Sequence, residues 1–204
     1  MKTEPNIATD TIAFLTKPDW PTAVYWIALL ASIFIAVRAW RDDPGQRGFH
    51  AAGIWALRVL IGTMWWQGSL WKIPPNYAGL LYFMKEVVDH AAIPLQRTLY
   101  ANLFIPNINL FGPLIYLTEA VIALSLIVGV FTRWFALLGL LMAGNLWLGL
   151  YSAPGEWPWT YGYLMVIQAL FILDPPGRCL GLDARWTDGS SHDRARLGPL
   201  TTRA

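Results

Sequence analysis

Long apolar segments alternate with short polar ones along most of the chain. Five windows are apolar and nearly free of charge, and they cover residues 20–37, 51–71, 111–132, 134–151 and 157–173. A helix needs roughly 20 apolar residues to cross a bilayer, with about 17 to 25 tolerated. The second window contains one charged residue, Arg58, and the third contains one, Glu119. The pattern predicts an all-α integral membrane protein with five transmembrane helices.

The segment between the second and third windows, residues 73–110, has the pattern of an amphipathic helix. On a helical wheel one face is apolar (Leu80, Met84, Val87, Val88 and Ala91) and the other is polar (Lys85, Glu86, Asp89 and His90). Such a helix lies in the membrane interface. We expect Pro94 to end it and residues 99–111 to run along the membrane surface, where they would cap the helix bundle from outside.

Polar segments lie at both ends. Residues 1–19 and 187–204 are predicted to be tails that are disordered in isolation, residues 20–50 an extra transmembrane helix with a loop, and residues 51–186 a four-helix core. The extra helix contains no polar residue that we expect to be buried, so it could equally face a partner. Glu4, Asp10 and Asp19 argue against a cleavable signal peptide. The first apolar helix is therefore expected to act as the insertion signal.

Basic residues are distributed unevenly between the two sides of the predicted spans. With the N-terminus outside, the cytoplasmic side holds Arg38, Arg41, Arg47, Arg133, Arg178, Arg185, Arg194, Arg196 and Arg203. The outer side then holds only Lys2, Lys17, Lys72, Lys85 and Arg97. Cytoplasmic loops carry the excess of Lys and Arg, which predicts a periplasmic N-terminus and a cytoplasmic C-terminus.

Composition supports a membrane protein and argues against several other classes. Hydrophobic residues make up 55% of the chain and charged residues 14%, whereas average globular proteins carry about 25% charged residues. The net charge of +2 gives no support for nucleic-acid binding. Cys179 is the single cysteine, so neither an intramolecular disulfide nor a CxxC redox pair is possible.

Arg58 and Glu119 are the two charges that lie deepest in the predicted spans. Placing a charge at mid-bilayer costs about 2.5 to 3.5 kcal/mol on insertion scales, so such residues face the bundle interior and pair. Arg58 shares a helical stripe with Gly62, Trp65, Ser69 and Lys72, and Glu119 shares one with Gly112, Tyr116 and Ala123. We expect Arg58 and Glu119 to form a buried ion pair at the centre of the bundle.

Two interpretations of this pair remain open. In one, it fixes the register and rotation of the helices. In the other, it belongs to a polar cavity that receives a quinone head group or relays a proton, together with Gln67, Tyr116, Asn145 and Gln168.

Histidine and cysteine do not form a recognisable ligand set. His50, His90 and His192 are neither helically spaced nor deep in a predicted span, which argues against a bis-histidine haem. Metal clusters need convergent Cys, His or carboxylate ligands, and none is predicted. We expect no metal and no covalent cofactor, with quinone and lipids as the candidate ligands.

Three motifs follow one another along residues 51–186. The first consists of Arg58, Gly62, Gly68 and Lys72, and it resembles the opening helix of the DoxX-like family of bacterial inner-membrane proteins. Glu119, Gly129, Thr132 and Arg133 resemble its second core helix and the turn that follows. Gly177, Arg178, Gly181 and Asp183 resemble its closing motif. The resemblance implies a four-helix membrane bundle over residues 51–186 and, in one branch, the DoxD-like small subunit of thiosulfate:quinone oxidoreductase.

Two functions of different classes follow. One is an accessory or scaffold subunit of a larger respiratory or photosynthetic electron-transfer complex, which packs against other membrane subunits and shapes a quinone site or path. The alternative is a DoxD-like enzyme subunit that oxidises a small sulfur compound and passes electrons to quinone. The chain encodes no redox-active thiol pair, so it is expected to lack catalytic activity on its own. A solute transporter would need more unpaired polar groups along one path.

Overall fold

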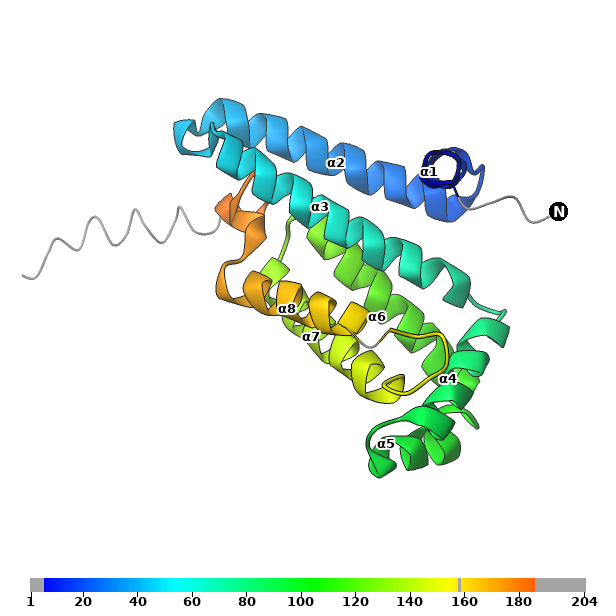
Figure 1. Cartoon of the computed structure of the whole chain (residues 1–204). Coiled ribbons are helices and arrows are strands. Elements are labelled where there is room, and N and C mark those ends of the chain that lie inside the picture. Colours follow the sequence, from blue (N-terminus) through cyan, green and yellow to red (C-terminus); the bar gives the residue numbers. More distant parts are fainter. Residues whose placement is uncertain (1–5, 158, 186–204) are drawn as a thin grey trace, which may run out of the picture.

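A computed structural model describes residues 6–157 and 159–185, and this part of the chain is all-helical. Its elements are α1 (Ile7–Thr16), α2 (Trp20–Asp42), η1 (Pro44–Gln46), α3 (Phe49–Ser69), η2 (Leu70–Lys72), α4 (Ala78–His90), α5 (Pro94–Leu99), η3 (Tyr100–Phe104), α6 (Ile108–Val128), α7 (Thr132–Gly149), α8 (Trp159–Leu173) and η4 (Pro176–Arg178). In Figure 1 the long helices α2, α3, α6, α7 and α8 run side by side, and the shorter helices α1, α4 and α5 lie toward one end. The predicted C-terminal tail lies outside the described residues.

Each of the five apolar windows forms a helix, which confirms that part of the prediction. Two of these helices, α2 and α6, are long and apolar enough to cross a membrane. The apolar helix α8 is shorter, with 15 residues. Each long helix has low amphipathicity, because apolar side chains point both into the bundle and away from it. The outward-facing apolar residues include Ile27, Leu30, Phe34, Leu57, Leu60, Trp134, Leu141, Val166 and Leu170.

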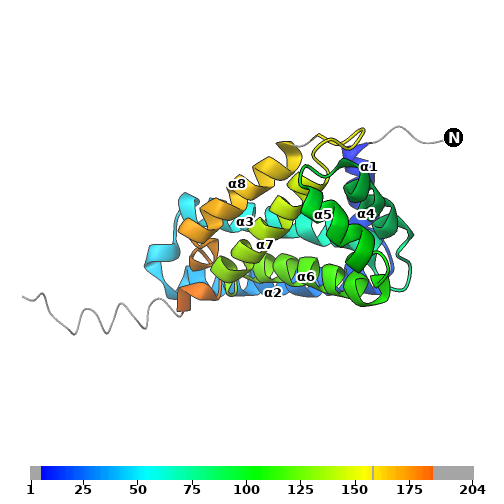
Figure 2. The same cartoon turned by 90° about the horizontal axis from the view of Figure 1, so that it is seen from below.

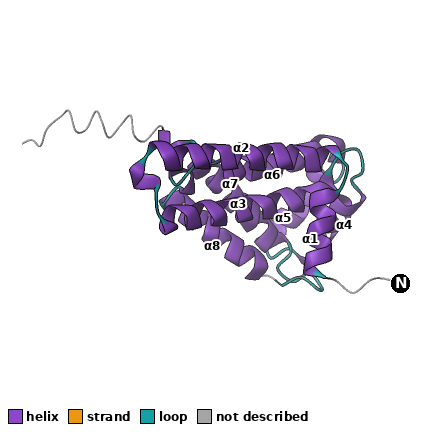
Figure 3. Ribbon diagram, turned by 90° about the horizontal axis from the view of Figure 1, so that it is seen from above, coloured by secondary structure: helices purple, strands orange, loops and turns teal. Residues whose placement is uncertain are grey.

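The bundle is built on close packing of α3 with α6 and of α7 with α8, while α2 lies along α3 and α6 (Figures 1 and 3). Its central core has fully buried side chains from α6, among them Ile122, Leu126 and Ile127. Helices α3 and α6 come very close together at Gly62. A Cβ at this position would lie 2.9 Å from the backbone nitrogen of Ile127 and 3.0 Å from the carbonyl oxygen of Ala123. A small residue here lets the two backbones pack directly.

The N-terminal segment forms a helix, so the prediction of a tail over residues 1–19 is wrong for residues 7–16. The Asn6 side chain accepts hydrogen bonds from the backbone N–H groups of Ala8 and Thr9 and so caps α1. The indole N–H of Trp26 then donates to the carbonyl of Leu15 at 2.9 Å, which ties α1 to α2. Sequence reasoning weighted the polar composition and missed the cap.

Helix α2 begins at a second cap, where the Asp19 carboxylate accepts a hydrogen bond from the Thr22 N–H at 3.0 Å. A hydrogen bond from Lys17 holds the pKa of Asp19 at about 2, below its usual value. The cap is therefore ionised at neutral pH and favourable at a helix N-terminus.

The expectation that α2 lacks buried polar residues is also wrong. Ser32 is fully buried, and its hydroxyl accepts a hydrogen bond from the Trp55 indole at 3.1 Å. Tyr25 and Thr63 share a hydrogen bond at 3.1 Å. Both contacts join α2 to α3, so α2 is a packed member of the bundle rather than a helix added to its surface.

Helices α4 and α5 with η3 cover the end of the bundle at which α3 ends and α6 begins (Figures 1 and 2). The predicted apolar face of α4 is the buried one, with Leu80, Met84 and Val87 inside. The expectation that Pro94 ends this helix was wrong, because α4 ends at His90 and Pro94 begins α5. Proline fits the first turn of a helix, where its missing N–H would have no partner anyway. Residues 100–104 form η3, which continues directly from α5.

The opposite end of the bundle is closed by η4 and the residues after it. The Asp183 carboxylate accepts hydrogen bonds from the backbone N–H groups of Phe131 and Thr132 and from the Thr132 hydroxyl. It therefore caps α7 from 51 residues away in the chain. Gln46 joins the α2–α3 connection to the same end through hydrogen bonds with Arg178 and Leu180.

Candidate functional site

A buried ion pair joins Lys72 of η2 to Glu119 of α6. The Lys72 ammonium donates to both carboxylate oxygens at 2.5 Å, and the two side chains are 8% and 2% exposed. The ammonium also lies 4.6 Å from the centre of the Trp71 ring, in cation–π geometry. The prediction that Glu119 pairs with Arg58 is therefore wrong.

The register of α3 against α6 explains this correction. Gly62 lies against Ala123 and Ile127, and the antiparallel arrangement then places Arg58 opposite Gly129. Gly129 is ten residues from Glu119, and at 1.5 Å per residue the two levels are ~15 Å apart. An arginine side chain cannot span that distance. Lys72 can reach Glu119 because side chains at the end of a helix lean back toward its N-terminus.

Arg58 is fully buried at the other end of the bundle. Its Nη1 donates to the carbonyl oxygens of Leu126 at 2.5 Å and Ile127 at 2.9 Å, in the last turn of α6. Gly129 follows with φ +82°, and a Cβ there would collide with the guanidinium. Asp183 adds electrostatic attraction. A cation at a helix C-terminus satisfies carbonyls that have no partner within the helix. Arg58 is thus a cap for α6.

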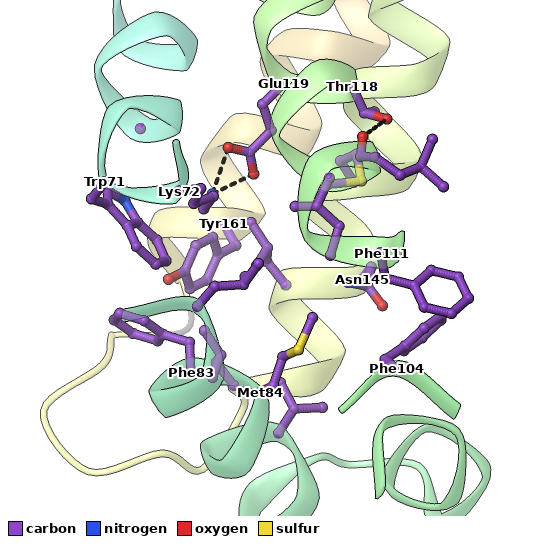
Figure 4. Close-up of a pocket in the computed structure, with 18 of the residues that line it drawn as sticks. Trp71, Lys72, Phe83, Met84, Phe104, Phe111, Thr118, Glu119, Asn145 and Tyr161 are labelled. Atoms are coloured by element: carbon purple, nitrogen blue, oxygen red, sulfur yellow. Dashed lines mark hydrogen bonds and ion pairs between the residues drawn. The ribbon is translucent and has the colours of Figure 1, made fainter. Parts of the chain in front are cut away.

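The Lys72–Glu119 pair forms part of the wall of a cavity of about 560 Å³. The cavity lies in the half of the bundle next to α4, between α3, α6, α7 and α8, and it is lined mainly by apolar and aromatic side chains (Figure 4). In this view Trp71 and Phe83 lie on the side opposite Phe104 and Phe111, and Met84 of α4 lies below the ion pair. This volume falls within the range of about 300–1,000 Å³ found for ligand pockets.

Further polar groups line the cavity and are held by hydrogen bonds. The Tyr161 hydroxyl donates to Glu156 at 3.0 Å. On α7, the Asn145 amide donates to the Tyr100 hydroxyl at 2.8 Å and accepts from Gln96 at 2.9 Å. Burial raises the pKa of Tyr100 above its usual value, so the phenol stays protonated at neutral pH. The cavity therefore has one charged pair and a few fixed dipoles within an apolar lining.

Of the predicted cavity residues, Glu119 and Asn145 line the cavity, and the other four do not. Gln67 is exposed on the outside of α3. Tyr116 is buried in the central core of the bundle. Gln168 is fully buried against Gly139 of α7, and within the described part of the chain its amide has no hydrogen-bond partner. Arg58 lies at the far end of the bundle, beside the last turn of α6.

Sequence reasoning missed Lys72 as a site residue because it lies at the end of an apolar window, where lysine usually reaches to the interface. The signal was present, since Lys72 is on the same helical stripe as Arg58, Gly62 and Ser69. Trp65 and Trp71 also line the cavity.

Cys179 lies beside η4, far along the bundle from the cavity, and is partly buried. Burial raises the pKa of its thiol above the usual value, so the unreactive thiol form dominates at neutral pH. Within residues 6–157 and 159–185, no three His, Cys, Asp or Glu side chains form a group that could hold a metal ion.

Comparisons of this chain with protein-family models, with curated proteins and with solved structures find no match.

Proposed function

We propose that the chain is an integral membrane protein of the bacterial inner membrane that binds a quinone in the cavity beside Lys72 and Glu119, as a subunit of a larger electron-transfer complex. The observation that carries the proposal is a buried ion pair in the wall of an otherwise apolar cavity. Burying two charges is costly unless their partners are in place, and ionisable groups kept inside a membrane bundle mark ligand or proton sites.

The arrangement of the helices supports five spans. The apolar residues that point away from the bundle occur on all five long helices, and a bilayer would cover them. The amphipathic helix α4 would then lie at the outer interface. Arg38, Arg41, Arg133 and Arg178 lie at the end of the bundle closed by η4, while Lys17 and Lys85 lie toward the other end. This charge distribution favours a periplasmic N-terminus and a cytoplasmic C-terminus.

The orientation can be tested with introduced cysteines in a Cys179→Ser background. In intact cells whose outer membrane has been permeabilised, a membrane-impermeant maleimide should label Thr3→Cys. It should label Ser190→Cys only after the inner membrane is opened. The reverse pattern would contradict the proposed orientation.

A quinone head group suits the chemistry of the cavity. The ammonium of Lys72 can donate to a quinone carbonyl, and aromatic side chains such as Trp71 and Phe83 can pack against a flat ring. A bound quinone needs a partner that supplies or accepts electrons. Because the sequence has one cysteine and no recognisable set of haem or metal ligands, we place that partner on another subunit.

The positions of the motif residues support the DoxX-like resemblance as part of the proposal. Arg58, Gly129, Thr132 and Asp183 come from three separate motifs, yet they meet at one end of the bundle. Lys72 and Glu119 come from two motifs and meet in the cavity. A shared geometric role for residues so far apart in sequence is what a family pattern would preserve.

Purification in a mild detergent from the native membrane tests the proposal with two readouts. Solvent extraction followed by mass spectrometry should recover quinone from the wild type and markedly less from Glu119→Gln. The control is Gln168→Met, which changes a buried polar residue outside the cavity and should retain the quinone. Cytochromes or pigment proteins should co-purify. A lone, quinone-free protein would refute the proposal, and a lone protein that consumes thiosulfate would favour the enzyme alternative.

A further inference from the structure

We propose that the ligand of this cavity is a neutral, carbonyl-bearing head group with a long apolar tail, and that the tail leaves the protein through a slot at Gly68. This inference rests on the proposed function and extends it, because it defines which part of the ligand the protein encloses and where the rest lies.

The slot is defined by three residues of α3 and η2 that line the cavity at helical spacing, Met64, Gly68 and Trp71. Met64 is 53% exposed and Trp71 is 43% exposed, although both line the cavity. A residue that faces both the cavity and the outside marks an opening. Between them Gly68 has no side chain. Apart from its two chain neighbours and the backbone of its own helix, no atom lies within 4 Å of the position that its Cβ would occupy. The wall of the cavity is therefore missing a side chain where it meets the surroundings of the bundle.

The other exposed lining residue offers a less open path. Leu114 of α6 is 54% exposed and also lines the cavity. A leucine side chain occupies that part of the wall, whereas at Gly68 the space is empty. At the end of the bundle, the fully buried Met84 of α4 closes the cavity. The Gly68 slot is thus the opening that an extended chain can use without displacing a side chain.

The ion pair determines which charge of head group the cavity favours. Lys72 donates to both oxygens of Glu119, so the pair carries no net charge toward the cavity. A phosphate head group would need a net positive site, and within the described residues that line the cavity the one cation is already neutralised by Glu119. A ligand carbonyl needs one donor, which the ammonium can supply. These features favour a quinone over a phospholipid.

The test compares two quinones with the same ring, one with a decyl tail and one with no tail, on the purified full chain in detergent. Binding is followed by quenching of tryptophan fluorescence, since Trp65 and Trp71 line the cavity. The variant Gly68→Leu fills the slot. Its matched control is Gly53→Leu, on the same helix. The Cβ position of Gly53 is equally open beyond its own helix backbone and chain neighbours, and Gly53 does not line the cavity.

We expect Gly68→Leu to bind the decyl quinone roughly tenfold more weakly, the effect of removing about two methylene groups from apolar contact. Its affinity for the tail-free quinone should stay within about twofold of the wild type, and Gly53→Leu should change neither affinity. If Gly68→Leu loses affinity for both quinones equally, or for neither, the slot is refuted while the quinone site is not. A wild type that binds neither quinone would overturn the proposed function and this inference together.

Discussion

Replacing Lys72 with methionine is expected to lower the free energy of unfolding by about 3 kcal/mol or more, because breaking a buried ion pair leaves an uncompensated charge inside the protein. The Glu119 carboxylate would lose both hydrogen bonds from the Lys72 ammonium. Unfolding in mixed micelles titrated with sodium dodecyl sulfate, followed by circular dichroism, measures the change.

The double variant Lys72→Met/Glu119→Met separates structure from function at this site. Replacing a whole buried pair with apolar residues of similar volume is often neutral or stabilising, so the free energy of unfolding should return to within about 1 kcal/mol of the wild type. Quinone binding should nevertheless be lost, because the ammonium that is proposed to donate to the carbonyl is removed. A stable double variant that binds quinone like the wild type would show that the pair only holds the helices together. A single Lys72→Met variant as stable as the wild type would contradict the pair itself.

The second large effect is expected at Arg58. Arg58→Met should lower the free energy of unfolding by about 3 kcal/mol, because the carbonyls of Leu126 and Ile127 would stay buried without their donor, at about 1–3 kcal/mol each. Quinone affinity of the folded protein should not change, since Arg58 lies 14 residues, or ~21 Å, from Lys72 along the chain of α3 and η2.

Arg58→Lys is the matched control for this prediction. It keeps a cation near the C-terminus of α6 and should recover part of the lost stability, although a lysine cannot reproduce the geometry of a guanidinium. The same detergent titration and the same fluorescence assay apply to both variants. Loss of quinone binding in a fully stable Arg58→Met protein would contradict the assignment of Arg58 as a cap and would place it in the binding site instead.

Helix positions could be predicted from the sequence because a helix satisfies its own backbone hydrogen bonds, so the pattern of side-chain hydrophobicity is enough to locate a long apolar helix. The five windows and the apolar face of α4 are of this kind. The helix α1 was missed because its existence depends on a local cap by Asn6 and on docking to Trp26, which outweigh its polar composition.

The partners of the buried charges could not be predicted from their positions along the helices. The expectation of an Arg58–Glu119 pair assumed that two charges in a membrane must meet, and it ignored two alternatives. A guanidinium can be satisfied by helix-terminal carbonyls, as Arg58 is, and a lysine at the end of a span can turn inward, as Lys72 does. Both alternatives depend on the register of α3 against α6, and Gly62 sets this register by direct backbone packing.

By itself, the sequence determined that this protein is a bundle of apolar helices with two charges buried inside it, since hydrophobic periodicity and the cost of burying charge act on each segment separately. Tertiary structure decided which charge pairs with which, that one end of the bundle is a set of helix caps, and that the other end encloses a cavity. These outcomes depend on the relative register of helices far apart in the chain, where a shift of a few residues moves a side chain by several ångströms and changes its partner.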